Sequence, residues 1–231
     1  MIHHITKGNG ETDIIFLHGF GGSVKSFAFA AEYMSGQCRT TLVDLYGFGE
    51  TPEPETPLTV DGYAESIVRL IEHYGMRSVV LVAHSFGGRV AMRLADGRCG
   101  AVKKLLLVDS AGIIPKRTFK YYLRVYAYKL LKKLRIELKA GSADYKSLSA
   151  VMKKTFVNIV NFDLTPHLYK ISCPTLIIWG ENDAETPMYM AKILHENIPD
   201  SALIVFENCG HFAYLDEPRK FLKILEAFAA G

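Results

Sequence analysis

The stretch Ala83-His84-Ser85-Phe86-Gly87-Gly88 is a sharp junction between two regular patterns. Residues 78–82 read Ser-Val-Val-Leu-Val, an apolar run typical of a buried strand, and residues 89–98 are compatible with a helix. A serine between such elements sits in a strained turn that excludes bulky side chains two positions away on either side. The stretch therefore predicts an exposed serine hydroxyl at the carboxyl end of a strand, facing a helix N-terminus.

Similar apolar runs recur along the chain and alternate with longer amphipathic stretches. The runs are nearly continuous, which is typical of parallel strands covered on both faces. Pro187 and Pro218 begin two of the helix patterns, where proline is favoured. These patterns predict a doubly wound, mostly parallel α/β sheet. The expected strands are residues 13–17, 40–45, 78–83, 104–108, 175–179 and 202–206, and the expected helices are 26–33, 59–74, 87–96, 187–198 and 218–229.

The alternation breaks once, between the strands at 104–108 and 175–179. Residues 112–170 hold thirteen Lys and Arg against three acidic residues, a net charge of +10, which leaves −7 for the rest. An apolar stripe at helical spacing runs through residues 119–134, and a second helix pattern covers about 145–159. We expect 112–170 to form a helical lid and residues 1–111 and 171–231 to form the core. Two ordinary crossover helices are the simpler alternative.

Composition bounds the class of protein. The chain has 231 residues, 49% hydrophobic and 22% charged, as in an ordinary globular domain. No apolar run approaches the roughly 18 residues that span a bilayer, and no signal peptide is recognisable, so a cytoplasmic location is expected. The cysteines lack metal-ligand spacing and are expected to be reduced thiols, with no metal and no cofactor. They are Cys38, Cys99, Cys173 and Cys209.

A glycine-rich turn follows the first strong strand, in Phe16-Leu17-His18-Gly19-Phe20-Gly21-Gly22. Its backbone N–H groups can face a ligand, and the Phe20 amide is the natural partner of the Phe86 amide in an oxyanion hole. Neither a P-loop nor a dinucleotide-binding glycine pattern is present. The turn is therefore not a phosphate cradle.

An acid and a histidine follow the last two expected strands. Asp183 ends Trp179-Gly180-Glu181-Asn182-Asp183, where a carboxylate can orient a histidine, and Glu181 and Glu185 compete for that role. His211 follows the final strand and can act as a general base. His84 precedes the serine and is expected to line the pocket instead. The order Ser85, Asp183, His211 is that of the α/β-hydrolase triad.

At this point the chain resembles the α/β-hydrolase superfamily, in particular its lidded, single-domain bacterial members. The resemblance runs from about residue 13 to the C-terminus and includes the motif Asp44-Leu45-Tyr46-Gly47-Phe48-Gly49-Glu50-Thr51. It implies Ser85 as nucleophile, Asp183 as acid and His211 as base, with oxyanion donors at Phe20 and Phe86. Ala83 replaces the usual first glycine of the turn. The short N-terminus predicts that the family's leading hairpin is reduced to one edge strand or lost.

The resulting hypothesis is a serine hydrolase that cleaves a small or medium carboxylic ester through an acyl-enzyme. A carbon–carbon bond hydrolase of vinylogous diketones is the alternative enzyme, with Arg117, Arg124 or Arg135 holding a substrate carboxylate. A small-molecule sensor built on the hydrolase scaffold is the alternative outside enzymology. The aromatic residues expected along an apolar pocket are Phe20, Phe48, Phe86, Phe119, Tyr122, Tyr126 and Phe212.

The basic lid also bears on partners. Clustered Lys and Arg can dock on an anionic membrane, but a solvated helix face is the simpler interpretation. Nucleic-acid binding is not expected, because no base-stacking module accompanies the charge. The expected partner is a small ester substrate, and the oligomeric state stays open.

Overall fold

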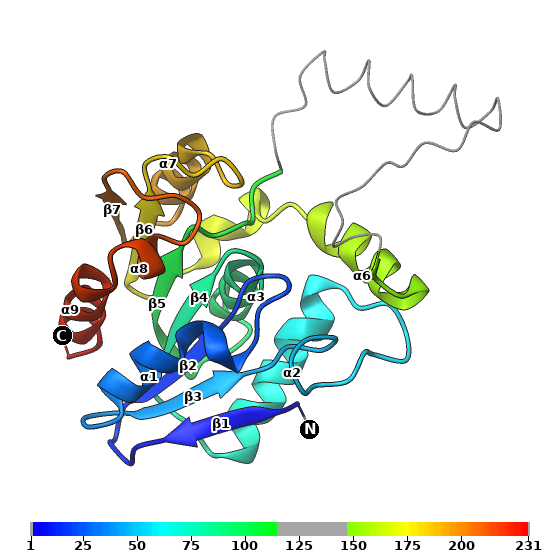
Figure 1. Ribbon diagram of the computed structural model, residues 1–231, viewed down its shortest axis with the longest axis horizontal. Coiled ribbons are helices and arrows are strands. Elements are labelled where there is room, and N and C mark those ends of the chain that lie inside the picture. The colour runs from blue at the N-terminus through cyan, green and yellow to red at the C-terminus, as the bar shows by residue number, and fades with distance from the viewer. Residues whose placement is uncertain (1, 115–146, 231) are drawn as a thin grey trace.

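The computed structural model describes residues 2–114 and 147–230 (Figure 1). The apolar stripe expected in the lid, with Tyr122 and Tyr126, lies outside these residues, as do the three candidate arginines. Within the described part of the chain, no helix is both long and apolar enough to cross a membrane.

One seven-stranded sheet forms the centre of the described residues, in the order β1-β3-β2-β4-β5-β6-β7. All neighbouring strands are parallel except β1, which pairs antiparallel with β3 at one edge. The expected mostly parallel sheet and single N-terminal edge strand are both confirmed. The strands are β1 His4–Lys7, β2 Asp13–Leu17, β3 Arg39–Val43, β4 Val79–His84, β5 Val102–Val108, β6 Thr175–Gly180 and β7 Ser201–Phe206.

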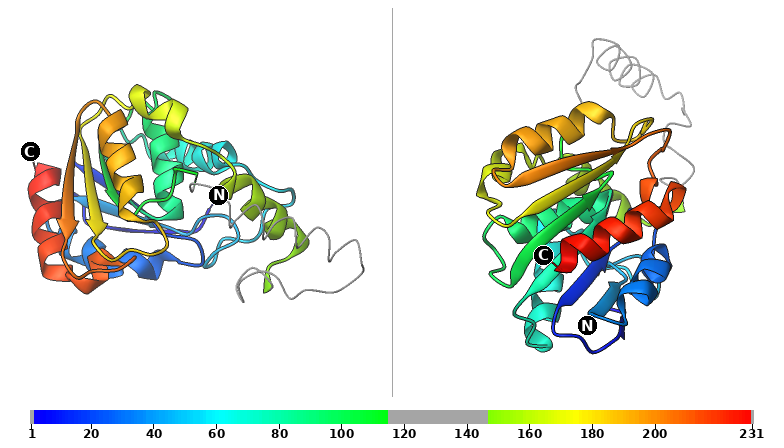
Figure 2. Two further views of the ribbon diagram at one scale, coloured as in Figure 1. Left: turned by 90° about the horizontal axis from the view of Figure 1, so that it is seen from above. Right: turned by 90° about the vertical axis from the view of Figure 1, so that its left-hand side faces the viewer.

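Helices cover both faces of this sheet. Helices α2, α3 and α7 pack on one face and α1 and α9 on the other, and the left view of Figure 2 shows α7 and α9 on opposite sides of β6 and β7. The helices are η1 Val24–Phe27, α1 Ala28–Met34, α2 Val60–His73, α3 Phe86–Ala95, α6 Ala150–Val160, η2 Thr165–Lys170, α7 Met188–Asn197, α8 Ala213–Asp216 and α9 Pro218–Ala230.

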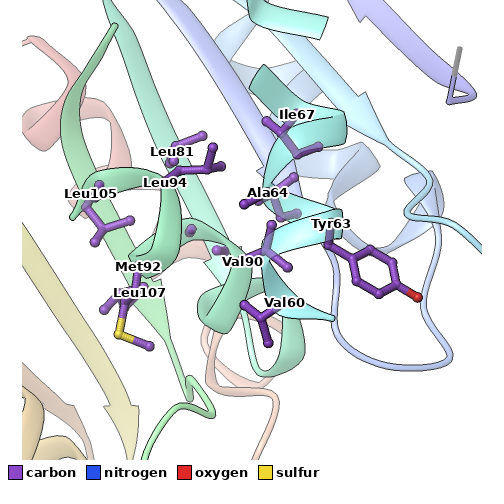
Figure 3. Close-up of a cluster of buried hydrophobic side chains, with 14 of the residues drawn as sticks. Val60, Tyr63, Ala64, Ile67, Leu81, Val90, Met92, Leu94, Leu105 and Leu107 are labelled. Carbon is purple, nitrogen blue, oxygen red and sulfur yellow. The ribbon is translucent and has the colours of Figure 1, made fainter. Parts of the chain in front are cut away.

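The continuous apolar runs of the strands supply two cores at once. Successive strand side chains point to opposite faces, so Leu81 packs in the cluster under α2 and α3, whereas Val80 and Val82 pack under α1 and α9. Figure 3 shows the first cluster, in which α2 and α3 meet above β4 and β5. Its labelled residues are Val60, Tyr63, Ala64, Ile67, Leu81, Val90, Met92, Leu94, Leu105 and Leu107.

Tyr63 connects this core to the loop that follows β3. Its buried ring contacts Phe86 at 5.0 Å, and its hydroxyl donates a hydrogen bond to the Tyr46 carbonyl at 2.9 Å. Asp44 holds the same loop by accepting bonds from the Val24 and Glu50 amides, at 2.7 and 2.9 Å. The Asp44–Thr51 motif thus forms a loop held by hydrogen bonds at the carboxyl edge of the sheet.

The described end of the expected lid, residues 147–170, packs against the core. Met152 and Leu164 are fully buried, and the hydroxyl of Thr155 accepts a hydrogen bond from the Leu58 amide at 3.0 Å. The buried guanidinium of Arg89 donates to the Phe162 carbonyl at 2.7 Å. Helix α6 is therefore anchored beside the loop after β3, at the end of the sheet where the site residues lie.

Candidate active site

Ser85 occupies a sharp turn between β4 and α3. Its backbone has φ 48° and ψ −113°, a left-handed conformation that costs energy for any residue with a side chain. Gly87, two residues later, faces the Leu17 carbonyl so closely that a Cβ would overlap it. Only glycine allows this approach, and the strain is offset by bonds from the Gly88 and Ala111 amides to the Ser85 carbonyl, both at 3.0 Å.

Strained residues gather at the same edge of the sheet. Among the described residues, the positive φ values outside glycine belong to Ser85, Asp109 and Asn208, at 48°, 45° and 60°. They follow the ends of β4, β5 and β7 respectively. Such strain persists where surrounding structure fixes it, and it concentrates at functional sites.

Asp183 and His211 form a buried pair on the loops after β6 and β7. Nδ1 of His211 lies 2.8 Å from Oδ2 of Asp183, whose side chain is fully buried. Asp183 also accepts bonds from the Glu185 and Thr186 amides at 2.8 and 2.9 Å and from the Thr186 hydroxyl at 2.5 Å. Burial opposes its ionisation, but these bonds outweigh burial and lower the pKa of Asp183.

The same contacts fix the protonation of His211. Burial lowers the pKa of His211, but the bond to Asp183 and the nearby charges of Asp183, Glu185 and Asp109 outweigh it, and the net shift is upward. An acceptor at Nδ1 places the proton of the neutral ring there and leaves a lone pair on Nε2. Nε2 is the atom a general base needs.

Ser85 and His211 line one cavity, but the Ser85 hydroxyl makes no hydrogen bond to His211 in this structure. Instead, Nε2 of His211 lies 3.4 Å from a carboxylate oxygen of Glu185. Catalytic hydrogen bonds are often long without substrate and shorten in the complex. Ser85 and His211 therefore lie in the same cavity without a hydrogen bond between their side chains.

The competing acids have different surroundings. Glu181 accepts a hydrogen bond from the Asn208 amide at 3.1 Å, and no described contact links it to His211. Glu185 lies near Nε2 of His211, the ring nitrogen that does not contact Asp183. Among the three candidates, only Asp183 contacts Nδ1.

His84 holds the loop that carries His211. Its Nε2 donates to the His211 carbonyl at 2.7 Å, and its ring lies 4.8 Å from that of His211. Burial lowers the pKa of His84 to about 3, so the ring is neutral near pH 7. His84 also lines the cavity, where the sequence placed it.

Asp109 is a site residue that the sequence reading missed. It directly follows β5 and is fully buried, and its carboxylate accepts bonds from the Gly180 amide at 2.7 Å and the Ala213 amide at 3.0 Å. Burial raises the pKa of Asp109 to about 7. Its signal, an acid after a buried strand, is the one that identified Asp183.

Phe86 directly follows Ser85 in the chain, and Phe20 lines the same cavity as Ser85. In the described part of the chain, neither residue's backbone N–H donates a hydrogen bond to a protein acceptor. His18 holds the Phe20 loop, with Nδ1 donating to the Gly19 carbonyl at 2.7 Å and Nε2 accepting from the Leu45 amide at 3.1 Å. Two unpaired donors beside a serine are the composition of an oxyanion hole.

The cavity above Ser85 has a volume of about 220 Å³. Phe20 and Phe212 line it. Phe48 and Phe86, which the sequence also predicts there, are not among its described lining: Phe48 is 92% buried with its ring centroid 4.8 Å from that of Phe20, and Phe86 is buried in the core. Phe156 of α6 contacts the same Phe20 ring at 5.1 Å. The described lining residues are Gly19, Phe20, Gly21, Gly22, Ser26, His84, Ser85, Glu185, His211, Phe212 and Tyr214. Within residues 2–114 and 147–230, no cluster of His, Cys, Asp and Glu is arranged to hold a metal ion.

Comparison with known proteins agrees with the fold. Residues 14–224 match the model of the alpha/beta hydrolase family. A pimeloyl-[acyl-carrier protein] methyl ester esterase of Nitrosomonas europaea is 28% identical, with 98% of each chain covered. A proline iminopeptidase of Saccharolobus solfataricus is 24% identical over 96% of this chain and 86% of that protein.

Solved structures share the fold. An esterase from Exiguobacterium antarcticum matches with a TM-score of 0.78 and 24% identity, covering 100% of this chain and 96% of that one. A thermophilic esterase from Thermogutta terrifontis matches with a TM-score of 0.77 and 22% identity, covering 98% and 92%. The parallel sheet, the turn at Ser85 and the family match over residues 14–224 lead to one conclusion: the chain belongs to the alpha/beta hydrolase family, and it is a hydrolase.

Proposed function

We propose that this hydrolase cleaves small carboxylic esters through an acyl-enzyme on Ser85. The observation that carries the proposal is one cavity lined by Ser85, by His211 already bonded to Asp183, and by Phe20, whose amide has no described protein acceptor. Nucleophile, oriented base and oxyanion donors are the three parts that acyl transfer needs.

In the first half of the reaction, His211 Nε2 takes the proton of the Ser85 hydroxyl as Oγ bonds to the ester carbonyl carbon. The Phe20 and Phe86 amides donate to the negative oxygen that forms. The ester C–O bond then breaks, and the alcohol leaves with the proton held on Nε2. Asp183 stabilises the charged imidazolium during both steps.

In the second half, water replaces the alcohol. His211 takes a proton from water, the hydroxide oxygen bonds to the acyl carbon, and the bond to Ser85 breaks as Oγ regains a proton. The products are a carboxylic acid and free enzyme. A buried, ionised Asp183 matters here because the imidazolium forms twice in each cycle.

The substrate class follows from the cavity and the relatives. About 220 Å³ is below the range typical of drug-sized ligands, which favours a small acyl group. The Phe20 ring and its aromatic neighbours make the wall apolar. The name of the Nitrosomonas europaea relative specifies ester hydrolysis, which supports an ester over other acyl substrates.

Labelling with a fluorophosphonate, followed by mass spectrometry of the modified peptide, tests the nucleophile. We expect one modified residue, Ser85, and no label in Ser85→Ala. Ser78→Ala is the matched control, because Ser78 is exposed just before the opposite end of β4, and it should label like the wild type. A label on another residue, or none, would overturn the mechanism.

A series of p-nitrophenyl esters of increasing acyl length tests the reaction and the size of the pocket. We expect kcat/KM to be highest for short chains and to vanish in Ser85→Ala. A vinylogous diketone in the same panel tests the carbon–carbon alternative, which would gain support if it were cleaved faster than every ester. Labelling of Ser85 without any turnover would favour the sensor hypothesis instead.

A further inference from the structure

Glu185 is a charged residue at the mouth of the cavity that the acyl-transfer mechanism does not use. Its amide donates to Asp183 Oδ1 at 2.8 Å, so the loop that holds the catalytic acid also fixes the backbone of Glu185. Its carboxylate Oε2 lies 3.4 Å from His211 Nε2, and its side chain is 70% exposed. The site therefore holds the backbone of Glu185, and its exposed carboxylate extends toward His211.

The chemistry of ester cleavage identifies which part of the substrate meets Glu185. The departing alcohol oxygen must receive its proton from His211 Nε2. A carboxylate 3.4 Å from that nitrogen lies on the alcohol side of the scissile bond, not on the acyl side. The substituent carried by the alcohol is thus the part of the substrate nearest to Glu185.

Among the described residues that line the cavity, Glu185 carries the one formal charge apart from the titratable His211. That described lining contains no Lys or Arg. His84 is neutral near pH 7, and burial raises the pKa of Tyr214 to about 12, so neither carries a charge there. Asp183 lies directly behind His211 and adds a second negative group. On the alcohol side, the described lining of the cavity is therefore suited to a cation.

We propose that Glu185 selects esters whose alcohol portion carries a positive charge, such as a quaternary or protonated amine. This rests on the proposed function, since it takes Ser85 as nucleophile and His211 as the proton donor to the alcohol. A substrate cation that pairs with Glu185 also draws the carboxylate away from Nε2, the atom that takes the Ser85 proton. Because Glu185 is exposed, its preference is modest, about fivefold.

The test compares two methylphosphonate thioesters of equal shape. One has a 2-(trimethylammonio)ethylthio leaving group and the other the neutral 3,3-dimethylbutylthio group. In both, Ser85 Oγ bonds to phosphorus, the P–S bond breaks, and the thiol leaves with the proton passed through His211. The second-order rate of Ser85 modification is measured for each at low and high salt.

We expect the wild type to react about fivefold faster with the cationic reagent at low salt, and salt to reduce the ratio. In Glu185→Gln the ratio falls to about one. Glu181→Gln is the matched control, because it removes the same charge from the same loop but outside the cavity lining, and it should keep the wild-type ratio. Equal rates in the wild type, or a preference that survives in Glu185→Gln, would overturn the inference.

The failures of inference and function are distinguishable. If neither reagent modifies Ser85, the nucleophile is wrong and both proposals fall. If Ser85 is modified at equal rates while esters are hydrolysed, only the role of Glu185 fails. Hydrolysis of acetylcholine and of 3,3-dimethylbutyl acetate repeats the comparison with substrates that turn over. If Ser85 is labelled but neither ester is hydrolysed, ester hydrolysis is rejected, and the ratio of the two labelling rates still decides the role of Glu185.

Discussion

The loops after β5 and β6 each place a buried aspartate near His211, yet the pKa values of the two carboxyl groups are shifted in opposite directions. Asp183 receives bonds from His211 and the Thr186 hydroxyl, and its pKa is lowered. Asp109 accepts hydrogen bonds from two backbone amides, and burial raises its pKa to about 7. Deeper burial of Asp109 raises its pKa, whereas the side-chain bonds from His211 and Thr186 outweigh burial at Asp183 and lower its pKa.

Replacement of the ionised acid should have the largest effect. Asp183→Asn keeps the size of the side chain but no longer holds the proton of His211 on Nδ1. We expect kcat on a p-nitrophenyl ester to fall roughly 10⁴-fold. Asp109→Asn should cost far less, because Asp109 does not contact the His211 ring. An equal loss in the two variants would break the distinction between the loops.

The same two variants should change stability with opposite dependence on pH. The raised pKa of Asp109 means that the unfolded chain releases this proton first, so wild-type stability falls as pH rises from about 4 to about 7. The free energy of unfolding of Asp109→Asn relative to that of the wild type should therefore increase over that pH range, by on the order of a few kcal/mol. Denaturant unfolding at several pH values measures it.

Asp183 predicts the reverse sign. Its lowered pKa gives stability that is present above the unfolded value near 3.8 and is lost as pH falls below it. Asp183→Asn should therefore be most destabilised relative to wild type at neutral pH and least at pH 3. Parallel pH dependence in the two variants would contradict the assignment of a raised pKa to Asp109 and a lowered pKa to Asp183.

A smaller effect is expected from the hydroxyl of Thr186. Thr186→Val keeps the shape but removes the donor at 2.5 Å from Asp183. Loss of a hydrogen bond to a charged group costs about 1.5–3 kcal/mol, and we expect kcat to fall about tenfold. Thr186→Ser, which restores the hydroxyl, should recover most of the activity, and failure to do so would point to packing instead.

The smallest expected effect is a shift in the pH profile. The charge of Glu185 helps to raise the pKa of His211, so activity should rise with pH as this base loses its proton. In Glu185→Gln the acid limb of kcat/KM should move to lower pH. The same plot for Glu181→Gln should match the wild type.

Much of the fold could be predicted because each apolar run encodes a strand by itself. The bounds of β2 match the prediction, and those of β3 to β7 differ by one or two residues at some ends. The Ser85 turn was equally local, since neighbouring small residues define it. Phe48 shows the limit of this reasoning. It is buried against the Phe20 ring instead of lining the cavity, and its neighbours in the sequence do not reveal this.

The sequence alone determined the order of strands and helices, the strained serine and the histidine after the last strand, because each depends on residues close together in the chain. Tertiary structure decided which carboxylate meets which face of the histidine. Glu181, Asp183 and Glu185 lie within five residues, yet Asp183 contacts Nδ1 and Glu185 contacts Nε2. That choice depends on how the loops after β5, β6 and β7 pack together, so residues far apart in the chain fix it.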